Sequence, residues 1–469
     1  MVQAEGHCSA EGGPENIGRV PPKMKIEMSV DELARQASKQ LSYQREKHCL
    51  EDGMSRATNL KEAYNNFYVE PLKNDQEFAE FYVERPGISP MIDLKDRIEI
   101  ADREEKYLFL GFRGSGKSTE LYRLEAALDE NRFIVVNYSI RDDLNLSDFD
   151  FRDFFVSMAL KVYDVALAKG IPLHPDIEGD FLDFAKRITK ITDDEVSRGK
   201  KAEISFGKII GLKLSREATT RQILRTELDQ KISDLIQRLN WLIVDIEDKS
   251  EKKLVIIVDD LDKLARGQQS EDFFYKNYQL LIEPSCFVIY TFPIPLAFNP
   301  QYENVRHAFT ADVVLLQMPI LKRNGKKHEE GRKFYRDVIS KRIDPKLLDE
   351  GVLDYAIEST GKLTELVEVM KEASLNAFRS GQERIAKKDV AAALDKLRMT
   401  FDRTLTDAHK KKLLEINSCK EAREEGPDSV LTRELLFSLT AVEYEDDQGR
   451  WCEINPMLAP LVEKWNQSP

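Results

Sequence analysis

The stretch Tyr107-Leu-Phe-Leu-Gly-Phe-Arg-Gly-Ser-Gly-Lys-Ser-Thr119 carries the most informative pattern in the chain. A short apolar run leads into Gly111-x-x-x-x-Gly116-Lys117-Ser118, and apolar residues at helical spacing follow it. This strand–loop–helix order is the context that a phosphate-binding P-loop requires. Its glycines let several backbone N–H groups converge on phosphate oxygens, at the positive end of the helix that begins there. The sequence therefore predicts a nucleotide-binding loop.

Two side chains of this loop have specific roles in phosphate chemistry. Lys117 supplies a compact positive charge to the β- and γ-phosphates, and the hydroxyl of Ser118 is a Mg²⁺ ligand. We expect a nucleoside di- or triphosphate, with Mg²⁺, to occupy the loop; the resemblance described below implies that it is ATP or ADP. The residues predicted to contact the nucleotide here are Gly111, Arg113, Gly114, Ser115, Gly116, Lys117, Ser118 and Thr119.

A second motif begins at Leu254, where Leu-Val-Ile-Ile-Val forms a short apolar run that ends in Asp259-Asp260-Leu-Asp262. Such a run is typical of a strand buried on both faces of a parallel sheet. Carboxylates at the end of a central parallel strand lie at the crevice where open α/β sheets bind ligands. We predict that Asp259 holds Mg²⁺, directly or through water, and that Asp260 orients the attacking water. Asp262 is either a third acidic group of the site or a cap of the next turn.

Two residues outside these motifs are further candidates. Thr291 ends an apolar strand pattern, and it is predicted either to sense the γ-phosphate or simply to cap the strand. Arg306 precedes the last strand and is a candidate arginine finger for a neighbouring subunit's nucleotide, because arginine stabilises developing phosphoryl charge. The alternative is a surface arginine. The arginines that compete for the finger role are Arg323, Arg332 and Arg342.

Composition excludes several classes of protein. The 469 residues carry a net charge of −13, which gives no overall attraction to nucleic acid or to an anionic membrane. Five cysteines are scattered without a Cys-x-x-Cys pair, which indicates a reducing compartment and no structural zinc site. No apolar run is long enough to span a bilayer, and no signal-peptide pattern occurs. A cytoplasmic protein is expected.

The chain divides into five predicted parts with an α/β architecture. A disordered start (1–22) and a helical, aromatic-rich segment (23–92) precede a P-loop ATPase domain of the ASCE type (93–319), whose parallel sheet has five strands. An α-helical lid (320–400) and a winged-helix-like domain (401–469) follow. Within the ATPase domain, the insertion at 171–215 is expected to contain a small hairpin at 202–214, followed by one long helix from Leu224 to Leu242. The aromatic residues of 63–84 are expected to pack onto the next domain or to form a binding surface.

The order of P-loop domain, helical lid and winged helix resembles that of STAND ATPases and of the origin-initiator branch of AAA+ proteins. The string Val-Ile-Ile-Val-Asp-Asp-Leu-Asp at 255–262 looks like the STAND type, particularly the KAP group, and Gly361–Met370 resembles their lid-helix motif. Thr364 stands where initiators carry a sensor-2 arginine, and the membrane segments typical of the KAP group are lacking. The resemblance implies an ATPase core that forms a homo-oligomer and delivers its output through a separate effector protein. Bacterial proteins of this kind often belong to antiviral defence systems.

Two functions follow from these observations. The first is a slowly hydrolysing, ATP-dependent switch that controls assembly or a protein effector; the alternative is a DNA-binding AAA+ ATPase of the initiator or loader kind. Residues 401–469 hold nine basic and fourteen acidic residues, and the predicted wing is acidic. DNA binding normally needs the opposite sign of charge, because neutralisation of phosphates supplies most of the affinity. We therefore favour the switch and expect the C-terminal segment to contact protein.

Overall fold

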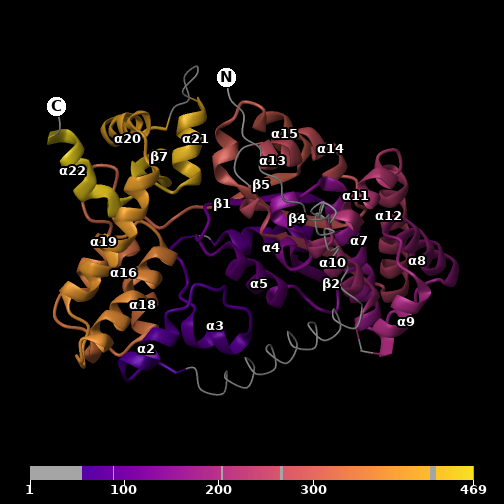
Figure 1. The fold of residues 1–469 in the computed structure, drawn as a ribbon, viewed down its shortest axis with the longest axis horizontal. Helices are drawn as coiled ribbons and strands as arrows, with labels where there is room; N and C mark the ends of the chain where they lie inside the picture. The colour runs from indigo at the N-terminus through magenta and orange to yellow at the C-terminus, as the bar shows by residue number, and fades with distance from the viewer. Residues whose placement is uncertain (1–54, 88, 202–203, 265–267, 423–428, 468–469) are drawn as a thin grey trace, which may run out of the picture.

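The computed structural model describes residues 55–87, 89–201, 204–264, 268–422 and 429–467 (Figure 1). The predicted disordered start at 1–22 lies outside this range. So does the first part of the predicted segment at 23–92, up to residue 54.

A parallel sheet forms the centre of the molecule. Its strands are β1 (Lys106–Gly111), β2 (Phe133–Ser139), β3 (Lys253–Asp259), β4 (Phe287–Pro293) and β5 (Ala311–Leu315), in the spatial order β2-β3-β4-β1-β5. All neighbouring strands pair in parallel, so their carboxyl ends meet at one edge. The P-loop follows β1 and the acidic motif follows β3, with β4 between the two. This arrangement confirms the predicted fold class.

Helices cover both faces of the sheet. Tyr107 and Phe109 of β1 face a layer that contains α4 (Pro90–Ile100) and α5 (Lys117–Ala127). Leu108 and Leu110 face the opposite layer, which includes α7 (Phe151–Ala168) and α12 (Ile232–Ser250). Successive side chains of each strand point to opposite faces of the sheet. Because helices cover both faces, all of these side chains are buried, which explains the continuous apolar runs of these strands. The helices α13 (Gln268–Glu271), α14 (Asn277–Leu281) and α15 (Tyr302–Ala308) lie along the chain between β3 and β5.

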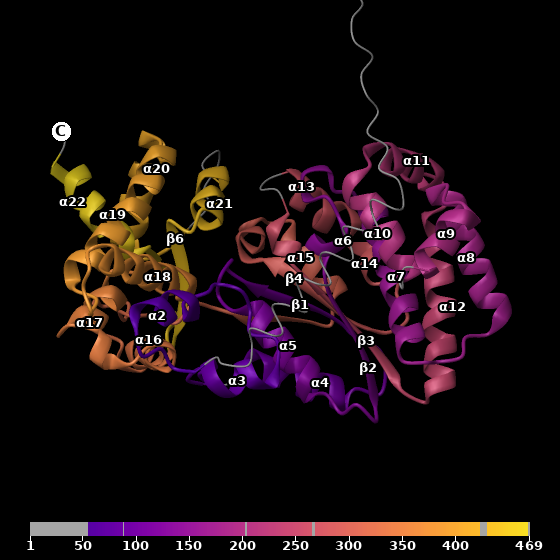
Figure 2. The ribbon, with the colours of Figure 1, turned by 60° about the horizontal axis from the view of Figure 1, so that its bottom comes forward.

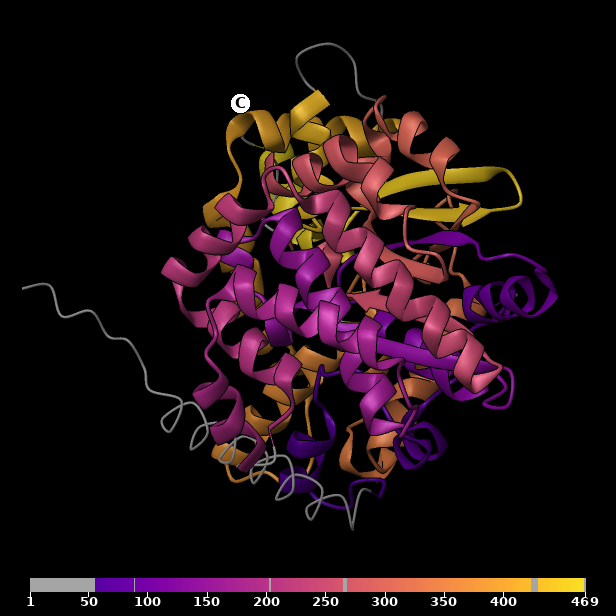
Figure 3. The ribbon, with the colours of Figure 1, turned by 90° about the vertical axis from the view of Figure 1, so that its right-hand side faces the viewer.

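The insertion is helical, and the predicted hairpin at 202–214 is wrong. The chain forms α8 (Pro175–Thr189), α9 (Asp193–Lys201), α10 (Phe206–Arg216) and α11 (Ala218–Leu228), which gather with α7 and α12 at the side of the molecule away from the lid (Figures 2 and 3). Ser205 caps α10 by accepting the backbone N–H of Lys208 at 3.2 Å. The predicted long helix is also wrong, because the chain breaks between α11 and α12 at 229–231.

Two glycines that suggested turns in this insertion serve helix packing instead. A Cβ added to Gly207 would lie 2.4 Å from a carboxylate oxygen of Asp164, and one added to Gly211 would lie 3.2 Å from a carboxylate oxygen of Asp143. Their spacing of four puts both on one face of α10, so the helix approaches α7 and α6 (Ile140–Asp143) closely.

The lid is built from two separate parts of the chain. Its helices are α16 (Glu329–Arg342), α17 (Val352–Glu358), α18 (Leu363–Arg379) and α19 (Lys387–Thr404), and α2 (Leu60–Asn66) packs into the same apolar core. Ala57 pairs with Ile343 as a parallel bridge. The adjoining helix α3 (Asp75–Phe81) lies between the lid and α5 (Figure 2).

The C-terminal region has the order of a winged helix. Helices α20 (Asp407–Cys419) and α21 (Ser429–Phe437) precede an antiparallel hairpin of β6 (Ala441–Asp446) and β7 (Gly449–Ile454), and α22 (Ala459–Gln467) follows. Gly449 has φ +104°, a value that the tight turn demands and that glycine adopts without strain. No helix among the described residues is long and apolar enough to cross a membrane.

Candidate nucleotide-binding site

The predicted P-loop connects β1 to α5 at the carboxyl edge of the sheet. Gly114 and Gly116 have φ values of +79° and +96°, in the region that other residues adopt only with strain. Gly116 stands directly before the first turn of α5, so the unpaired N–H groups of this helix face the loop. The local backbone is therefore that of an anion-binding loop.

Lys117 is almost completely buried beneath this loop. Its Nζ donates to the carbonyl oxygens of Gly111 at 3.0 Å and Phe112 at 2.9 Å, and it lies 3.0 Å from a carboxylate oxygen of Asp262. Asp262 thus occupies the position of a counter-ion for the lysine. A nucleotide phosphate bound in the loop would compete with Asp262 for Lys117.

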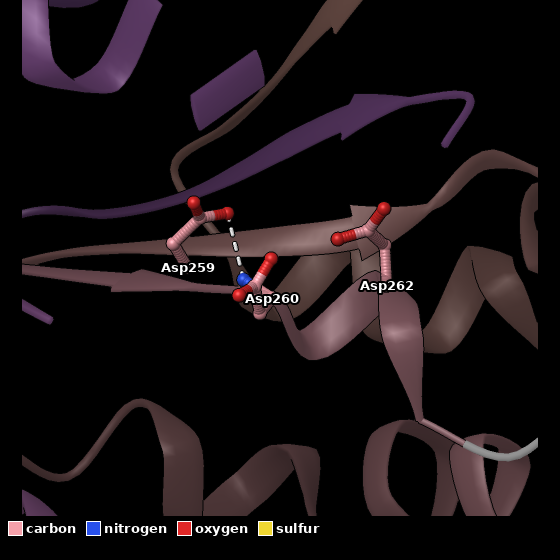
Figure 4. A group of neighbouring side chains, drawn as sticks. All are labelled: Asp259, Asp260 and Asp262. Carbon is pink, nitrogen blue, oxygen red and sulfur yellow. Dashed lines mark hydrogen bonds between the residues drawn. The ribbon is translucent and has the colours of Figure 1, made fainter. Parts of the chain in front are cut away.

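Three carboxylates gather after β3 (Figure 4), and oxygen atoms of Asp259, Asp260 and Asp262 all lie within 4.8 Å of one another. The hydroxyl of Ser118 hydrogen-bonds Asp259. Burial, together with the charges of the other two acids, raises the pKa of Asp259 to about 6. A bound dication would relieve this repulsion, and an all-oxygen donor set suits Mg²⁺. The residues present therefore fit the metal that the motif implies, with Ser118 and Asp259 to hold it.

Asp260 is held by two residues that the sequence patterns do not indicate. It has a left-handed backbone (φ +69°), which turns its side chain toward the end of β2. There the hydroxyl of Ser139 donates to its carboxylate at 2.5 Å, and Lys263 forms an ion pair with it. The carboxylate predicted to orient water is thus fixed by neighbours on both sides.

Thr291 and Arg306 lie outside the cavity at the P-loop. The Thr291 hydroxyl accepts the N–H of Leu261 at 3.0 Å and donates to the carbonyl of Val258 at 3.2 Å, so it joins β4 to the loop after β3. Arg306 is half exposed on α15 and lies 3.6 Å from Asp312 and 3.7 Å from Glu303. The roles proposed from the sequence, γ-phosphate sensing or strand capping for Thr291 and an arginine finger for Arg306, remain predictions.

A cavity of about 610 Å³ extends from the P-loop; Arg141 after β2 and Asp262 and Lys263 after β3 line it, together with three longer parts of the chain. The P-loop and the first turn of α5 form its floor. The aromatic segment before α4 and helices α16 and α18 of the lid form its walls. Apolar side chains of the aromatic segment and of the lid provide the surface that a nucleotide base needs: Tyr68, Phe81, Val83, Phe334, Val338, Leu363 and Val367.

The aromatic segment packs on α5, as one of the two expectations had it; it also lines this cavity, and its role as a binding surface remains a prediction. The hydroxyl of Tyr82 donates to buried Glu120 at 3.0 Å, and the guanidinium of Arg123 lies 3.8 Å from the centre of the Tyr82 ring. Arg85 donates to the carbonyl of Ser115 and, at 3.1 Å, to that of Leu316. This arginine fixes the P-loop backbone from outside the motif.

The lid contacts the P-loop directly through the start of α18. A Cβ added to Gly114 would lie 2.2 Å from the hydroxyl of Thr364, so the side chain of Thr364 packs closely on the loop backbone. Thr364, which stands at the sensor-2 position in the resemblance, is therefore placed against the loop, and Lys362 beside it lines the cavity.

The winged helix contacts both the lid region and the ATPase domain, and two of its polar contacts lie at the wing tip and in α21. Arg323 donates to a carboxylate oxygen of Asp446 at 3.1 Å and to the carbonyls of Gly449 and Arg450 at 2.9 and 3.3 Å. In α21, Arg433 lies 3.7 Å from Glu271. The α21 end also lines a hollow of about 220 Å³ beside the P-loop, whose wall includes Leu436, Phe437, Leu439, Pro293, Pro295 and Arg113. The tip of the wing and one end of α21 are thus engaged within the chain.

Comparison with known proteins gives only distant structural similarity. No family model and no curated protein matches the sequence. Solved structures with the same arrangement include the Aeropyrum pernix ORC1 protein in complex with DNA (14% identity, TM-score 0.38, covering 86% of this chain and 97% of that one). The Walker-type ATPase of Pyrococcus abyssi has 14% identity and a TM-score of 0.42, with 85% and 99% covered. The Thermotoga maritima RuvB Holliday junction branch migration motor has 10% identity and a TM-score of 0.34, with 85% and 98% covered. These TM-scores are all below 0.5, so the α/β P-loop architecture rests on the strand order and the loop geometry of the chain itself.

Proposed function

We propose that this chain binds Mg²⁺–ATP and hydrolyses it slowly. The observation that carries the proposal is the convergence of Lys117 and Ser118, at the start of α5, on the carboxylates that follow β3. Lys117 binds the phosphates once they displace Asp262. Ser118 and Asp259 hold Mg²⁺, which when bound neutralises phosphate charge. Asp260 accepts the proton of the attacking water, and Ser139 orients the carboxylate for that task.

The nucleotide state is further proposed to control the docked winged helix. Arg113 lies in the P-loop and lines both the nucleotide cavity and the hollow beneath α21. A nucleotide in the cavity would therefore lie against Arg113, which also lines the hollow beneath α21. The polar contacts of the wing tip and the buried apolar residues of α21 (Leu435 and Leu436) together hold the docked form, so the nucleotide must bind the docked and released forms with different affinities to shift their populations. This makes the chain a switch.

The partner of the released winged helix is proposed to be a protein, either another copy of the chain or a separate effector. The basic run of α20 is poorly suited to DNA: Lys412 is buried and lies 3.1 Å from Glu415, and Lys410 lies 5.8 Å from the centre of the Trp465 ring. The wing carries the exposed acids Glu445 and Asp447, with Asp446 between them in sequence. This charge pattern repels a phosphate backbone.

A DNA-binding AAA+ ATPase is the second candidate function. The solved structures named above include an initiator in complex with DNA and a branch migration motor, and they agree better with this alternative than with a signalling switch. A place in the STAND class, and with it a role in antiviral defence, rests on the motif resemblance at 255–262 and 361–370 alone.

Calorimetry with Mg²⁺–ATP tests the proposed function. Lys117→Ala removes charge-assisted hydrogen bonds of roughly 1.5–3 kcal/mol each, so the affinity should fall at least about tenfold. The exposed Lys411→Ala is the matched control and should bind as the wild type does. Equal binding by folded Lys117→Ala would refute the site. Tight, salt-sensitive duplex binding that is lost on replacing Lys410, Lys411 and Lys412 would establish the DNA-binding alternative.

A further inference from the structure

The arginine that follows β2 faces the nucleotide cavity of its own chain. We propose that Arg141 supplies, in cis, the positive charge that recognises the γ-phosphate and stabilises it during transfer. This inference rests on the proposed ATPase function and adds to it a residue that no sequence motif marks. It also removes the need for an arginine from a neighbouring subunit.

The sheet places Arg141 next to the acidic motif. Strand β2 pairs in parallel with β3, and Ser139 is in register with Asp259. Two residues further along, Arg141 lines the cavity together with Lys117, Ser118 and Asp262. Lys117 and Ser118 are the residues proposed to contact the phosphates and Mg²⁺, so the arginine lines the cavity together with the phosphate-binding residues.

The guanidinium of Arg141 is available for a ligand. Within the described part of the chain, no hydrogen bond or ion pair joins its side chain to another residue, and the side chain is exposed. Most other cations of the cavity have partners: Lys117 pairs with Asp262, Lys263 pairs with Asp260, Lys362 lies 3.3 Å from Glu365, and Arg85 donates to two carbonyls. An arginine that lines an anion site without an internal acceptor is suited to a phosphate, which it can bind in a bidentate manner.

One hydroxyl positions both Arg141 and the carboxylate of Asp260. Ser139 accepts the backbone N–H of Arg141 at 3.2 Å and donates to Asp260 at 2.5 Å. The helix that begins there, α6, is braced from behind: Asp143 lies 3.0 Å from Lys161 and packs closely on Gly211 of the insertion helix α10. The insertion thereby holds Arg141 at the mouth of the cavity.

This geometry assigns a role to each group in hydrolysis. The water oxygen forms a bond to the γ-phosphorus, the bond from that phosphorus to the bridging oxygen breaks, and ADP leaves with the electron pair. The water proton passes to Asp260 and from there to the phosphate product. Arg141 donates hydrogen bonds to γ-phosphoryl oxygens, whose charge must be stabilised in the transition state.

Single-turnover hydrolysis and calorimetry with Mg²⁺–ATP and Mg²⁺–ADP test the proposal on the full chain. Arg141→Ala should lower turnover by about 10³-fold or more, the range found for arginine fingers. It should weaken ATP binding by roughly 10- to 100-fold and leave ADP binding unchanged, because ADP lacks the group that Arg141 contacts. Arg141→Lys should restore part of each loss, since it keeps the charge without the planar fork. Wild-type turnover per chain should not depend on protein concentration.

The comparison variants are Arg306→Ala, which removes the finger candidate outside the cavity, and Arg103→Ala, which removes an exposed arginine on the loop after α4. Both should retain the wild-type turnover. The proposal is overturned if Arg141→Ala keeps the wild-type turnover and the wild-type preference for ATP, or if ATP and ADP binding weaken equally. Loss of turnover in Arg306→Ala alone would assign the role to a neighbouring subunit. A wild-type chain that binds neither nucleotide would instead refute the ATPase function itself.

Discussion

Replacing Arg323 by Ala should release the wing of the winged helix. Arg323 belongs to the segment between β5 and α16, and its guanidinium contacts the hairpin turn through one carboxylate and two backbone carbonyls. The turn residue Asp446 is its charged partner, at 3.1 Å. The variant removes all three contacts at once without altering the hairpin.

The size of the effect follows from exposure and bond type. The side chains of Arg323 and Asp446 are 30% and 28% exposed, so solvent screens their attraction and the pair contributes at most about 1 kcal/mol. Each hydrogen bond to a carbonyl adds roughly 0.5–1.5 kcal/mol. The buried Nε of Arg323 has no acceptor among the residues that the structure describes, which offsets part of the gain. A net loss of about 2 kcal/mol shifts the ratio of docked to released wing about thirtyfold.

Hydrogen–deuterium exchange measured on β6 and β7 reports this shift. Amides of the hairpin should exchange faster in Arg323→Ala, while those of β1–β5 should keep their protection. Arg336→Ala is the matched control, because this exposed arginine lies 2.7 Å from Asp354 within the lid and does not contact the wing. Equal hairpin protection in the two variants would show that Arg323 does not hold the wing, and the docked state would need another cause.

Four further results are expected. Asp260→Asn should bind Mg²⁺–ATP nearly as the wild type does but lose turnover in a phosphate-release assay, because it removes a role specific to the transition state; retained turnover would move that role to another acid. Asp262→Asn should raise ATP affinity by roughly 10-fold in calorimetry, since phosphate no longer competes with a buried counter-ion of Lys117; unchanged or weaker binding would mean that Asp262 serves the nucleotide. Gly114→Ala should push the lid off the P-loop and weaken ATP and ADP binding alike, because its Cβ would overlap Thr364; normal affinity would contradict that close packing. Burial raises the pKa of Glu443 to about 7, so the native state prefers the protonated acid and wild-type stability should fall as the pH rises from about 4.5 through 7. In thermal unfolding, Glu443→Gln should be as stable as the wild type near pH 4 and more stable at pH 8, by up to about 3 kcal/mol. A constant difference in stability across that pH range would refute the buried position of Glu443.

The parts of the site that could be predicted are those that lie together in the sequence. The P-loop and the acids after β3 are local patterns, since phosphate and Mg²⁺ require particular residue types at fixed spacing. Ser139, Lys263 and Arg85 carry no such pattern, because each reaches the site only through tertiary packing. Ser139 meets Asp260 only because β2 lies beside β3 in the sheet.

The error in the insertion has a similar origin. Gly207 is consistent with a hairpin turn when only neighbouring residues are considered, whereas its actual role is to let α10 approach Asp164 on α7. The same segment also places apolar residues at helical spacing (Phe206, Ile209, Ile210 and Leu214), and all four are buried. Weighing that periodicity above the short alternating run would have predicted the helix.

The two-part lid has a consequence for how the chain is made. Helix α2 belongs to the lid core, but Arg56 and its acceptor in Ile343 are 287 residues apart. At 5–20 residues per second, the start of the lid waits roughly 15–60 s on the ribosome for its partner, while the whole ATPase domain is synthesised in between. The ATPase domain therefore folds first, and the buried face of α2 stays exposed until α18 emerges. Chaperone capture of nascent chains should be concentrated in this interval and should disappear when the apolar residues of α2 are replaced.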